Sequence, residues 1–444
     1  MNALVQLLTE HRLALWTIAA GSLCSVSCAL LGCYLVLRRM SLLGDAISHA
    51  VLPGIVIAFL LQGRASLPAF IAAVVVGMLT AYGTESLTAL GRVPEDTSMG
   101  LIYTSLFALG VFLLTNLARN VDLDPGCVLY GAIELVPLDR QEVWGLEIPR
   151  AVVSLGLTAV ATLAFVLLLW KELKIISFDP ALAQALALRA GLVHYLLMGM
   201  IAWVTVASFE AVGSILVIAM LIVPPATAQL LTDRLDRMLL WSVIVGILSS
   251  ILGYILAARL DTTVAGMMAV VAGCQFTLAA LVAPRHGLLG QFVARFLLSL
   301  RIVSEDLAAM LYRAEELARR STSAPLTWAR CARALGGGPA AWLSALALRR
   351  RGKMQFGPGF RLQLTDAGRE SARSLVRAHR LWEAFLVEYF GLPLDHLHAP
   401  AERVEHYIGP QLQDRLAAAL EHADTDPHGR VIPSAGETPS PPAP

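Results

Sequence analysis

The feature that most constrains the fold of this chain is a succession of apolar segments between about residues 13 and 284. A helix needs about 20 apolar residues to cross the hydrocarbon core of a bilayer. Nine segments have roughly that length: 13–37, 46–62, 67–90, 98–118, 151–170, 191–208, 211–231, 239–257 and 262–283. The segments 191–208 and 211–231 can also form one broken span, which gives eight crossings and puts both termini on one side. The sequence therefore predicts an all-α polytopic membrane protein with about eight transmembrane helices.

Charged residues divide the chain into two parts. Over the whole chain 57% of residues are hydrophobic and 15% are charged, whereas a soluble domain has about 25% charged residues. Residues 301–444 nevertheless hold 18 Lys and Arg, 16 Asp and Glu and six of the ten His. We therefore expect a membrane domain over 1–290, a linker over 291–303, a soluble region, and a Pro-rich, disordered tail over 434–444. Lys353–Leu364 is predicted to form two strands around Gly357-Pro358-Gly359.

The sharpest local signal in the membrane part is RRMSLLGDAISHAVLPG, residues 38–54. Asp45 and His49 lie four residues apart, so a helix places both side chains on one face. Their oxygen and nitrogen donors suit manganese, zinc or iron better than copper(I). The same spacing fits a capping Asp above a satisfied His, but ionisable residues inside spans usually face cavities, which favours a permeation site. Glu85 and Glu210 also lie in apolar stretches, and we expect them to be paired structural carboxylates.

This region has a specific resemblance. The chain resembles the permease subunit of manganese/zinc/iron ABC importers, whose second-span signature is similar to LGCYLVLRRMSLLGDAISHAVLPGIVIAFLL. The resemblance covers about residues 10–290. It continues through three further blocks in the same order: 95–114, 178–191 and 208–239. Several separated blocks in the right order make the resemblance specific.

The resemblance implies a multi-pass permease in the cell inner (plasma) membrane that moves a divalent transition metal inwards, with manganese favoured over zinc and iron. It implies that Asp45 and His49 coordinate the ion, and that the segment from Asp179 to Gly191 docks on an ATPase. The implied partners are a second permease copy forming a homodimer, separate ABC ATPase subunits and an extracytoplasmic metal-binding protein. No GxxxxGK[ST] loop occurs in the chain, so we expect no enzyme activity, with ATP hydrolysis left to the ATPase subunits.

A second cluster of potential metal ligands lies in the soluble part: His379, Glu383, His396, His398, Glu402, Glu405 and His406. On helices, His379 shares a face with Glu383, and Glu402 shares a face with His406. Glu405 precedes His406 by one residue, so the two side chains are about 100° apart around the helix axis. Glu405 could therefore bind a second ion or complete a shared site. A solvated charged helix face is the alternative. Imidazoles and carboxylates without thiolate favour manganese, iron or zinc, and such binding weakens as pH falls towards about 6.

Residues 304–433 resemble the diphtheria-toxin-repressor family of metal-dependent regulators through SEDLAAMLYRAEELARR, RLQLTDAGRESARSLVRAHRLWEAFL, GLPLDHLHAPAERVEHYI and TDPHGRVIP. The resemblance implies a winged-helix-like domain over 304–370 and a helical metal-binding and dimerisation domain over 371–433. One metal site of the family matches His379, Glu383 and His398. The other matches Glu402, Glu405 and His406, with Asp306 from the first helix.

Two details qualify this resemblance. Iron-type members have Cys where this chain has Glu402, and a carboxylate in place of a thiolate favours manganese as the bound divalent ion. Ala309 stands where manganese-type members place a second carboxylate, so we expect that site to be weaker or differently completed, and we expect no ligands from the family's additional C-terminal domain.

The expected helix-turn-helix, about 327–351, lacks the polar residues that read bases. Its second helix, Pro339–Leu348, is almost wholly Ala, Leu and Trp, with Ser344 the only hydroxyl, and the triple glycine 336–338 replaces a structured turn. DNA recognition needs hydrogen-bonding side chains on this helix. A basic run follows that is suited to phosphates, anionic membrane lipid or the ATPase surface: Arg349, Arg350, Arg351 and Lys353.

Two hypotheses follow. In the first, the chain is an importer permease whose fused cytoplasmic domain senses the transported metal and regulates uptake. In the alternative, it is a membrane-tethered, metal-dependent transcriptional regulator that binds DNA. A third reading makes the soluble part a remnant that only holds the dimer together.

Overall fold

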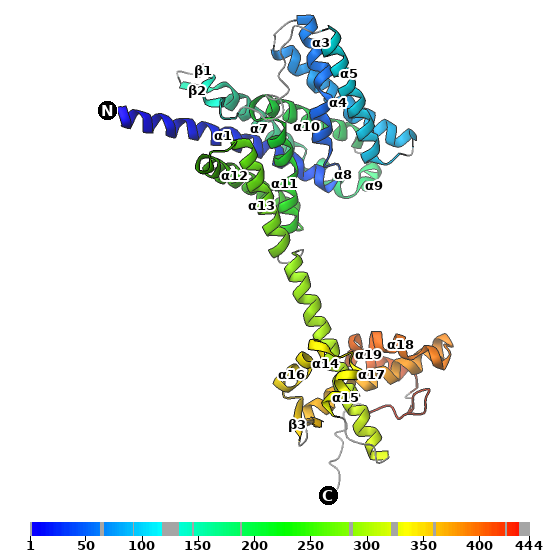
Figure 1. Ribbon diagram of the computed structural model, residues 1–444. Coiled ribbons are helices and arrows are strands. Elements are labelled where there is room, and N and C mark those ends of the chain that lie inside the picture. The colour runs from blue at the N-terminus through cyan, green and yellow to red at the C-terminus, as the bar shows by residue number, and fades with distance from the viewer. Residues whose placement is uncertain are drawn as a thin grey trace. The chain divides into compact units, whose positions relative to one another are not determined.

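The computed structural model describes residues 2–62, 66–91, 93–117, 133–143, 146–186, 189–283, 287–320, 327–357, 361–421 and 424–434. The chain divides into two compact units, Met1–Gln291 and Phe292–Pro444 (Figure 1). Pro358 and Gly359 of the predicted turn, and the predicted disordered tail after residue 434, lie outside the described residues.

The first unit is helical. Nine helical segments of the described residues are long and apolar enough to cross a membrane. They are formed by α1 (Asn2–Leu37), the consecutive α2 (Leu43–Ala50) and α3 (Leu52–Gln62), α4 (Ser66–Gly91), α5 (Glu95–Leu117), α7 (Arg150–Leu168), α10 (Ala190–Val212), α11 (Ser214–Leu231), α12 (Leu235–Leu260) and α13 (Val264–Val282). Gly213 alone, with φ 82°, separates α10 from α11. The stretch left open as one broken span thus forms two helices of spanning length, and the number of crossings stays a prediction.

Helix α1 lies at the centre of this unit and packs against α7, α10, α11 and α12. Its small and aromatic side chains Cys24, Cys28 and Tyr34 are fully buried. A Cβ on Gly32 would lie 2.0 Å from the carbonyl oxygen of Leu221, so the backbones of α1 and α11 are in direct contact there. Small residues allow this close approach, which drives helix association in lipid.

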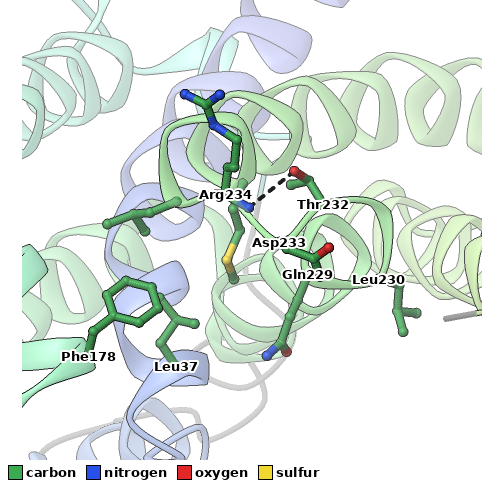
Figure 2. A pocket seen from close by; sticks show the side chains of 9 residues that line it. Leu37, Phe178, Gln229, Leu230, Thr232, Asp233 and Arg234 are labelled. Carbon is green, nitrogen blue, oxygen red and sulfur yellow. Dashed lines mark hydrogen bonds between the residues drawn. The ribbon is translucent and has the colours of Figure 1, made fainter. Parts of the chain in front are cut away.

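The two ends of the first unit are built differently. At one end the last residues of α1 meet α8 (Trp170–Phe178) and the loop between α11 and α12. These three segments line a groove of about 340 Å³ (Figure 2). Helix α8 leads into α9 (Pro180–Ala185). At the other end are η1 (Val136–Leu138) and the hairpin of β1 (Arg140–Val143) and β2 (Leu146–Pro149). Glu134 Oε1 accepts a 2.7 Å hydrogen bond there from the first N–H of α13. Helix α13 therefore returns towards the end that carries α8 and α9.

The second unit begins with α14 (Leu288–Arg320), a helix-turn-helix of α15 (Trp328–Ala334) and α16 (Gly338–Arg350), and a hairpin of β3 (Met354–Gly357) and β4 (Arg361–Leu364). Buried Leu307, Leu311, Cys331 and Leu348 form its core with residues of the hairpin. The expectation that the triple glycine replaces a structured turn was wrong. All three glycines have positive φ, between 71° and 79°, and form a defined turn between α15 and α16, because glycine adopts this conformation without steric cost.

The remainder of the second unit is α17 (Asp366–Phe390), η3 (Leu394–His396), α18 (His398–Val404), η4 (Glu405–Tyr407) and α19 (Pro410–Ala419). Thr365 caps α17 by accepting a hydrogen bond from the N–H of Gly368, and Gly391, with φ 62°, ends it. A second core forms around Leu381, Ile408 and Leu416. The predicted fold class is confirmed: an all-α polytopic membrane part followed by a winged-helix and a helical domain.

Candidate metal sites

The membrane pair lies on the short helix α2. Asp45 Oδ1 is 3.4 Å from His49 Nε2, and the two side chains are 39% and 40% exposed. Helix α2 ends one residue after His49, and Pro53 has no N–H to donate to the carbonyl of His49. Rings of Tyr103 and Phe107 on α5 lie 6.0 and 6.2 Å from the imidazole. The pair therefore offers oxygen and nitrogen donors on one helix face, as the sequence predicted, and it lies next to the break between α2 and α3.

Glu85 belongs to a separate polar chain. Arg38 Nη1 lies 2.9 Å from His194 Nδ1, and His194 Nε2 lies 3.3 Å from Glu85 Oε2. Arginine only donates, so Nδ1 accepts and Nε2–H faces the carboxylate. Glu85 is thus the paired carboxylate expected from the sequence. Glu210, near the end of α10, is exposed in this chain.

The segment expected to dock on the ATPase forms α8 and α9. Asp179 lies between them and caps α9, because its Oδ1 accepts a 2.9 Å hydrogen bond from the N–H of Leu182. Leu182 and Leu186 are exposed. Gly191 lies exposed in the first turn of α10, with no atom within 4 Å of a built Cβ. Phe178, the last residue of α8, lines the groove shown in Figure 2, so an apolar surface surrounds the segment.

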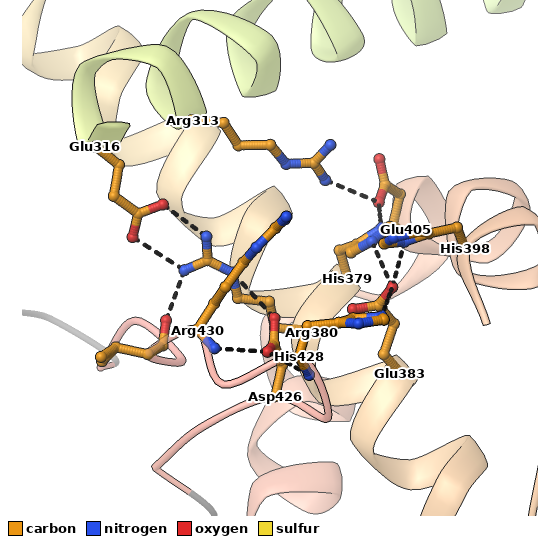
Figure 3. A network of polar contacts seen from close by, with 11 residues as sticks. Arg313, Glu316, His379, Arg380, Glu383, His398, Glu405, Asp426, His428 and Arg430 are labelled. Atoms are coloured by element: carbon orange, nitrogen blue, oxygen red, sulfur yellow. Dashed lines mark hydrogen bonds and ion pairs between the residues drawn. The ribbon is translucent and has the colours of Figure 1, made fainter. Parts of the chain in front are cut away.

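In the second unit, His379, Glu383 and His398 bring one ligand atom each within 4.8 Å of one another. Glu383 is buried, and its Oε1 lies 3.1 Å from His379 Nε2 and 2.5 Å from His398 Nδ1 (Figure 3). This oxygen has no hydrogen-bond partner of acceptable geometry among the described residues. A buried carboxylate oxygen surrounded by imidazole nitrogens but not hydrogen-bonded to them is the donor arrangement of a metal site.

His428 is a further donor that the sequence analysis did not single out. Its Nε2 lies 4.0 Å from Glu383 Oε1, and its ring stacks on His398 at 4.9 Å. Asp426 positions it, because Asp426 Oδ1 accepts hydrogen bonds from the N–H groups of His428 and Arg430 at 2.9 and 2.7 Å. The Asp-Pro-His-Gly sequence indicates this turn, but only the fold brings it to α17.

A second group contains Asp306, Glu405 and His406. His406 Nε2 lies 3.2 Å from Asp306 Oδ1 and 3.9 Å from Glu405 Oε1, while its Nδ1 lies 2.8 Å from Glu305 Oε2. Glu305 was missed by the sequence analysis. A carboxylate on the second nitrogen fixes the tautomer and leaves Nε2 to a metal, which is the usual arrangement of a ligating histidine.

Glu405 joins the two groups. It is buried, and its Oε2 makes a short contact with His379 Nδ1 while its other oxygen faces His406. Arg313 Nη2 lies 3.9 Å from Glu405 as well. One carboxylate therefore contacts both donor groups, as Figure 3 shows for the His379 side.

Two of the predicted ligands lie elsewhere. Glu402 is exposed and belongs to neither group, and His396 is also exposed. The expected continuous helix through residues 402–406 was wrong, because α18 ends at Val404 and the 3₁₀-helix η4 follows. Three residues per turn replace 3.6 there, so Glu402 and His406 no longer share a face. Ligation by Glu402 stays a prediction.

The carboxylates change the titration of both buried histidines. Asp306, Glu305 and Glu405 raise the pKa of His406 to about 9 against the opposing effect of burial. Burial lowers the pKa of His379, but Glu383 and Glu405 outweigh it and the net pKa is raised. Because the pKa of both histidines is raised, a metal competes with protons for these imidazoles.

A network of ion pairs holds both groups in place (Figure 3). Buried Arg380 on α17 donates to both carboxylate oxygens of Glu316 on α14, at 3.1 and 2.6 Å, and to the carbonyl oxygen of Val431 at 2.6 Å. Its Nε also lies 3.8 Å from Asp426. Arg380 therefore links the helix that carries Asp306, the helix that carries His379 and the loop that carries His428.

Comparison with known proteins gives two family matches. Residues 10–283 match the ABC 3 transport family, and residues 365–434 match the metal binding and dimerisation domain of iron dependent repressors. The manganese transport system membrane protein MntD of Bacillus subtilis (strain 168) is 46% identical over 276 residues, covering 62% of this chain and 93% of MntD. The zinc transport system membrane protein TroD of Treponema pallidum (strain Nichols) is 41% identical over 284 residues, covering 64% and 76%. The solved structure of PsaBC from Streptococcus pneumoniae in complex with Fab has a TM-score of 0.53 and 30% identity, covering 64% of this chain and 98% of that chain.

Proposed function

The chain belongs to the ABC 3 transport family, and from this membership we propose that it is the permease subunit of an ABC importer for a divalent transition metal. Both resemblances expected from the sequence, to the importer permeases and to the metal-dependent regulators, are confirmed. The chain is a multi-pass membrane protein. The observation that carries the proposal is the Asp45–His49 pair at the break of α2, inside the matched region.

The transported ion is manganese in this proposal, with zinc and iron as alternatives. The similar proteins are named for manganese and zinc transport. A carboxylate and an imidazole bind any of these ions, and intrinsic affinity follows the order in which zinc exceeds manganese. The donor set of the second unit combines carboxylates with imidazoles and has no cysteine in either group, so a hard ion such as manganese suits the sensing site in this proposal.

ATP hydrolysis belongs to separate ATPase subunits that dock on α8 and α9. Exposed Leu182 and Leu186 and the adjoining groove supply an apolar surface for that contact. A second copy of the permease and an extracytoplasmic metal-binding protein complete the importer. The second unit lies on the cytoplasmic side, since α13 returns to the end of the membrane unit that carries the ATPase-docking segment.

The second unit is the metal sensor of this importer. The donors fit a divalent ion at each group: His379, Glu383 and His398 with His428 beside them, and Asp306, Glu405 and His406 with Glu305 orienting the imidazole. A bound ion supplies positive charge that gathers these carboxylates. Glu405 transmits occupancy of one group to the other, because a carboxylate drawn towards one ion changes its contact with the other histidine.

Occupancy of the sensor biases the conformational equilibrium of the importer and inhibits uptake when cytoplasmic metal is plentiful. Such coupling between two sites is typically about 1–3 kcal/mol. The alternative role as a DNA-binding regulator is not favoured, because Ser344, the one hydroxyl of α16, is buried and its Oγ donates to the carbonyl of Ala341.

The test is uptake of radioactive manganese by proteoliposomes that contain the full chain, its ATPase subunits and the binding protein. Asp45→Asn with His49→Ala should abolish ATP-dependent uptake, whereas Glu142→Gln, on the hairpin β1, should leave it unchanged. Manganese loaded inside the vesicles should slow uptake by the intact chain, and Glu383→Gln with His406→Ala should remove that inhibition. Uptake unaffected by the first variant contradicts the transport site, and inhibition unaffected by the second contradicts the sensor.

A further inference from the structure

The helix-turn-helix and hairpin of the second unit carry charge of one sign. Residues 321–365 contain no Asp or Glu and seven basic residues: Arg330, Arg333, Arg349, Arg350, Arg351, Lys353 and Arg361. Lys353 donates a 2.8 Å hydrogen bond to Ser371 Oγ, whereas the six arginines are exposed. Within the described part of the chain none of these arginines forms an ion pair with a carboxylate. This face is therefore suited to a surface dense in negative charge.

The same helix-turn-helix and hairpin form an apolar groove, which defines one face of this part of the unit. Trp328 of α15, Trp342 and Leu346 of α16 and Phe356 of β3 line a groove of about 360 Å³, with Arg349 at its edge. Trp342 is 60% exposed and Phe356 is 41% exposed, and the guanidinium of Arg349 lies 5.5 Å from the centre of the Phe356 ring. An exposed aromatic cluster of this kind on a soluble domain indicates a binding surface.

The arrangement does not suit a duplex. In a helix-turn-helix the second helix enters the major groove and reads base edges with hydrogen-bonding side chains. The accessible side of α16 offers exposed Trp342 and half-buried Leu346 instead, and Ser344 is turned into the core. Indole rings flanked by arginines are the side chains that settle at the boundary between lipid headgroups and acyl chains.

We propose that this face, Trp328, Trp342, Leu346 and Phe356 with the flanking arginines, docks on a bilayer that contains anionic phospholipid. The aromatic side chains enter the headgroup region, and the arginines pair with lipid phosphates. The covalent link to a membrane-spanning unit keeps the face close to a bilayer at high effective concentration, so weak contacts suffice. The winged helix of this chain thus acts as a membrane-docking module, a role beyond transport and metal sensing.

The test is hydrogen exchange of the full chain in nanodiscs, read on peptides that cover α16 and β3. Nanodiscs of phosphatidylcholine alone are compared with nanodiscs that contain about a third phosphatidylglycerol. We expect exchange in α16 to slow roughly ten-fold in the anionic bilayer, and this protection to weaken at high salt. Equal exchange in the two bilayers overturns the proposal.

Two variants and one competitor sharpen the result. Arg349→Gln with Arg350→Gln and Arg351→Gln should remove the lipid-dependent protection, as should Trp342→Ser, whereas Arg403→Gln with Arg415→Gln, exposed arginines on α18 and α19, should retain it. Manganese binding by each variant reports that the unit is folded. Protection that persists in both test variants contradicts the proposal. Mixed-sequence duplex DNA that protects α16 in phosphatidylcholine nanodiscs as strongly as anionic lipid does also contradicts it.

Discussion

Manganese binding to the second unit should be tightly linked to pH. The pKa of His406 is raised to about 9 by Asp306 and Glu305, one carboxylate at each ring nitrogen. At pH 7 such a group is neutral in only about 1% of molecules. A metal binds the neutral imidazole, so it must displace this proton. Apparent affinity at this group should therefore rise about fifty-fold from pH 7 to pH 9, about 2.3 kcal/mol in total.

The sign follows from the competition between metal and proton. Raising pH removes the proton and strengthens binding, and the dependence levels off above the pKa of about 9. The pKa of His379 is raised as well. The affinity for manganese therefore depends more steeply on pH where both groups bind an ion together. This proton competition acts in addition to the general loss of histidine ligation in acid.

The assay is a titration of the full chain with Mn²⁺ in which the free ion is measured by electron paramagnetic resonance. The chain carries Asp45→Asn and His49→Ala, so that ions bind the second unit. Asp306→Asn should lower the pKa of His406 and flatten the dependence of manganese affinity on pH. Asp366→Asn, a fully exposed carboxylate at the start of α17, is the matched control and should leave it unchanged. A manganese affinity constant that changes by less than about two-fold between pH 7 and pH 9 refutes the proton competition at His406.

Three further changes test the structure. His428→Ala should weaken manganese binding at the Glu383 group roughly ten-fold, as measured by the same titration. Arg380→Met should remove the charge that pairs with Glu316 and faces buried Asp426, and it should destabilise the second unit by about 3–5 kcal/mol, seen as a lower midpoint of denaturant unfolding. Arg380→Lys should not restore the stability because lysine cannot pair bidentately. Gly32→Val should separate α1 from α11 at the carbonyl of Leu221 and reduce the thermal stability of the detergent-solubilised chain, whereas Gly100→Ala, where a Cβ meets nothing within 4 Å, should have little effect.

The membrane part was predictable because a backbone in lipid is restricted to structures that satisfy their own hydrogen bonds. A segment without water must satisfy its own hydrogen bonds, so apolar length alone indicates a helix. The i, i+4 spacing of Asp45 and His49 fixed their common face for the same reason. The break at Gly213 was harder, since a continuous apolar run can turn within one residue when that residue is a glycine with positive φ.

The sensing site was predictable where ligands share one helix and not where folding brings helices together. His379 and Glu383 are one turn apart on α17, and their proximity follows from helix geometry. Glu305 and His428 come from α14 and from a loop 123 positions apart (428 − 305), and no local pattern relates them. The shared face expected for Glu402 and His406 was not found for a local reason, because the change from α18 to η4 alters the number of residues per turn.

The shared carboxylate gives the two donor groups a reason to respond together. Glu405 contacts His379 of one group and faces His406 of the other, and it is buried. Glu405 raises the pKa of both His379 and His406, so the charge state of each histidine depends on this one carboxylate. A metal ion held by one group would compete with a proton there and draw Glu405 towards itself, which would weaken the effect of this carboxylate on the histidine of the other group. The second group then binds its metal more easily, and the sensor responds over a narrower range of metal concentration than two independent sites would.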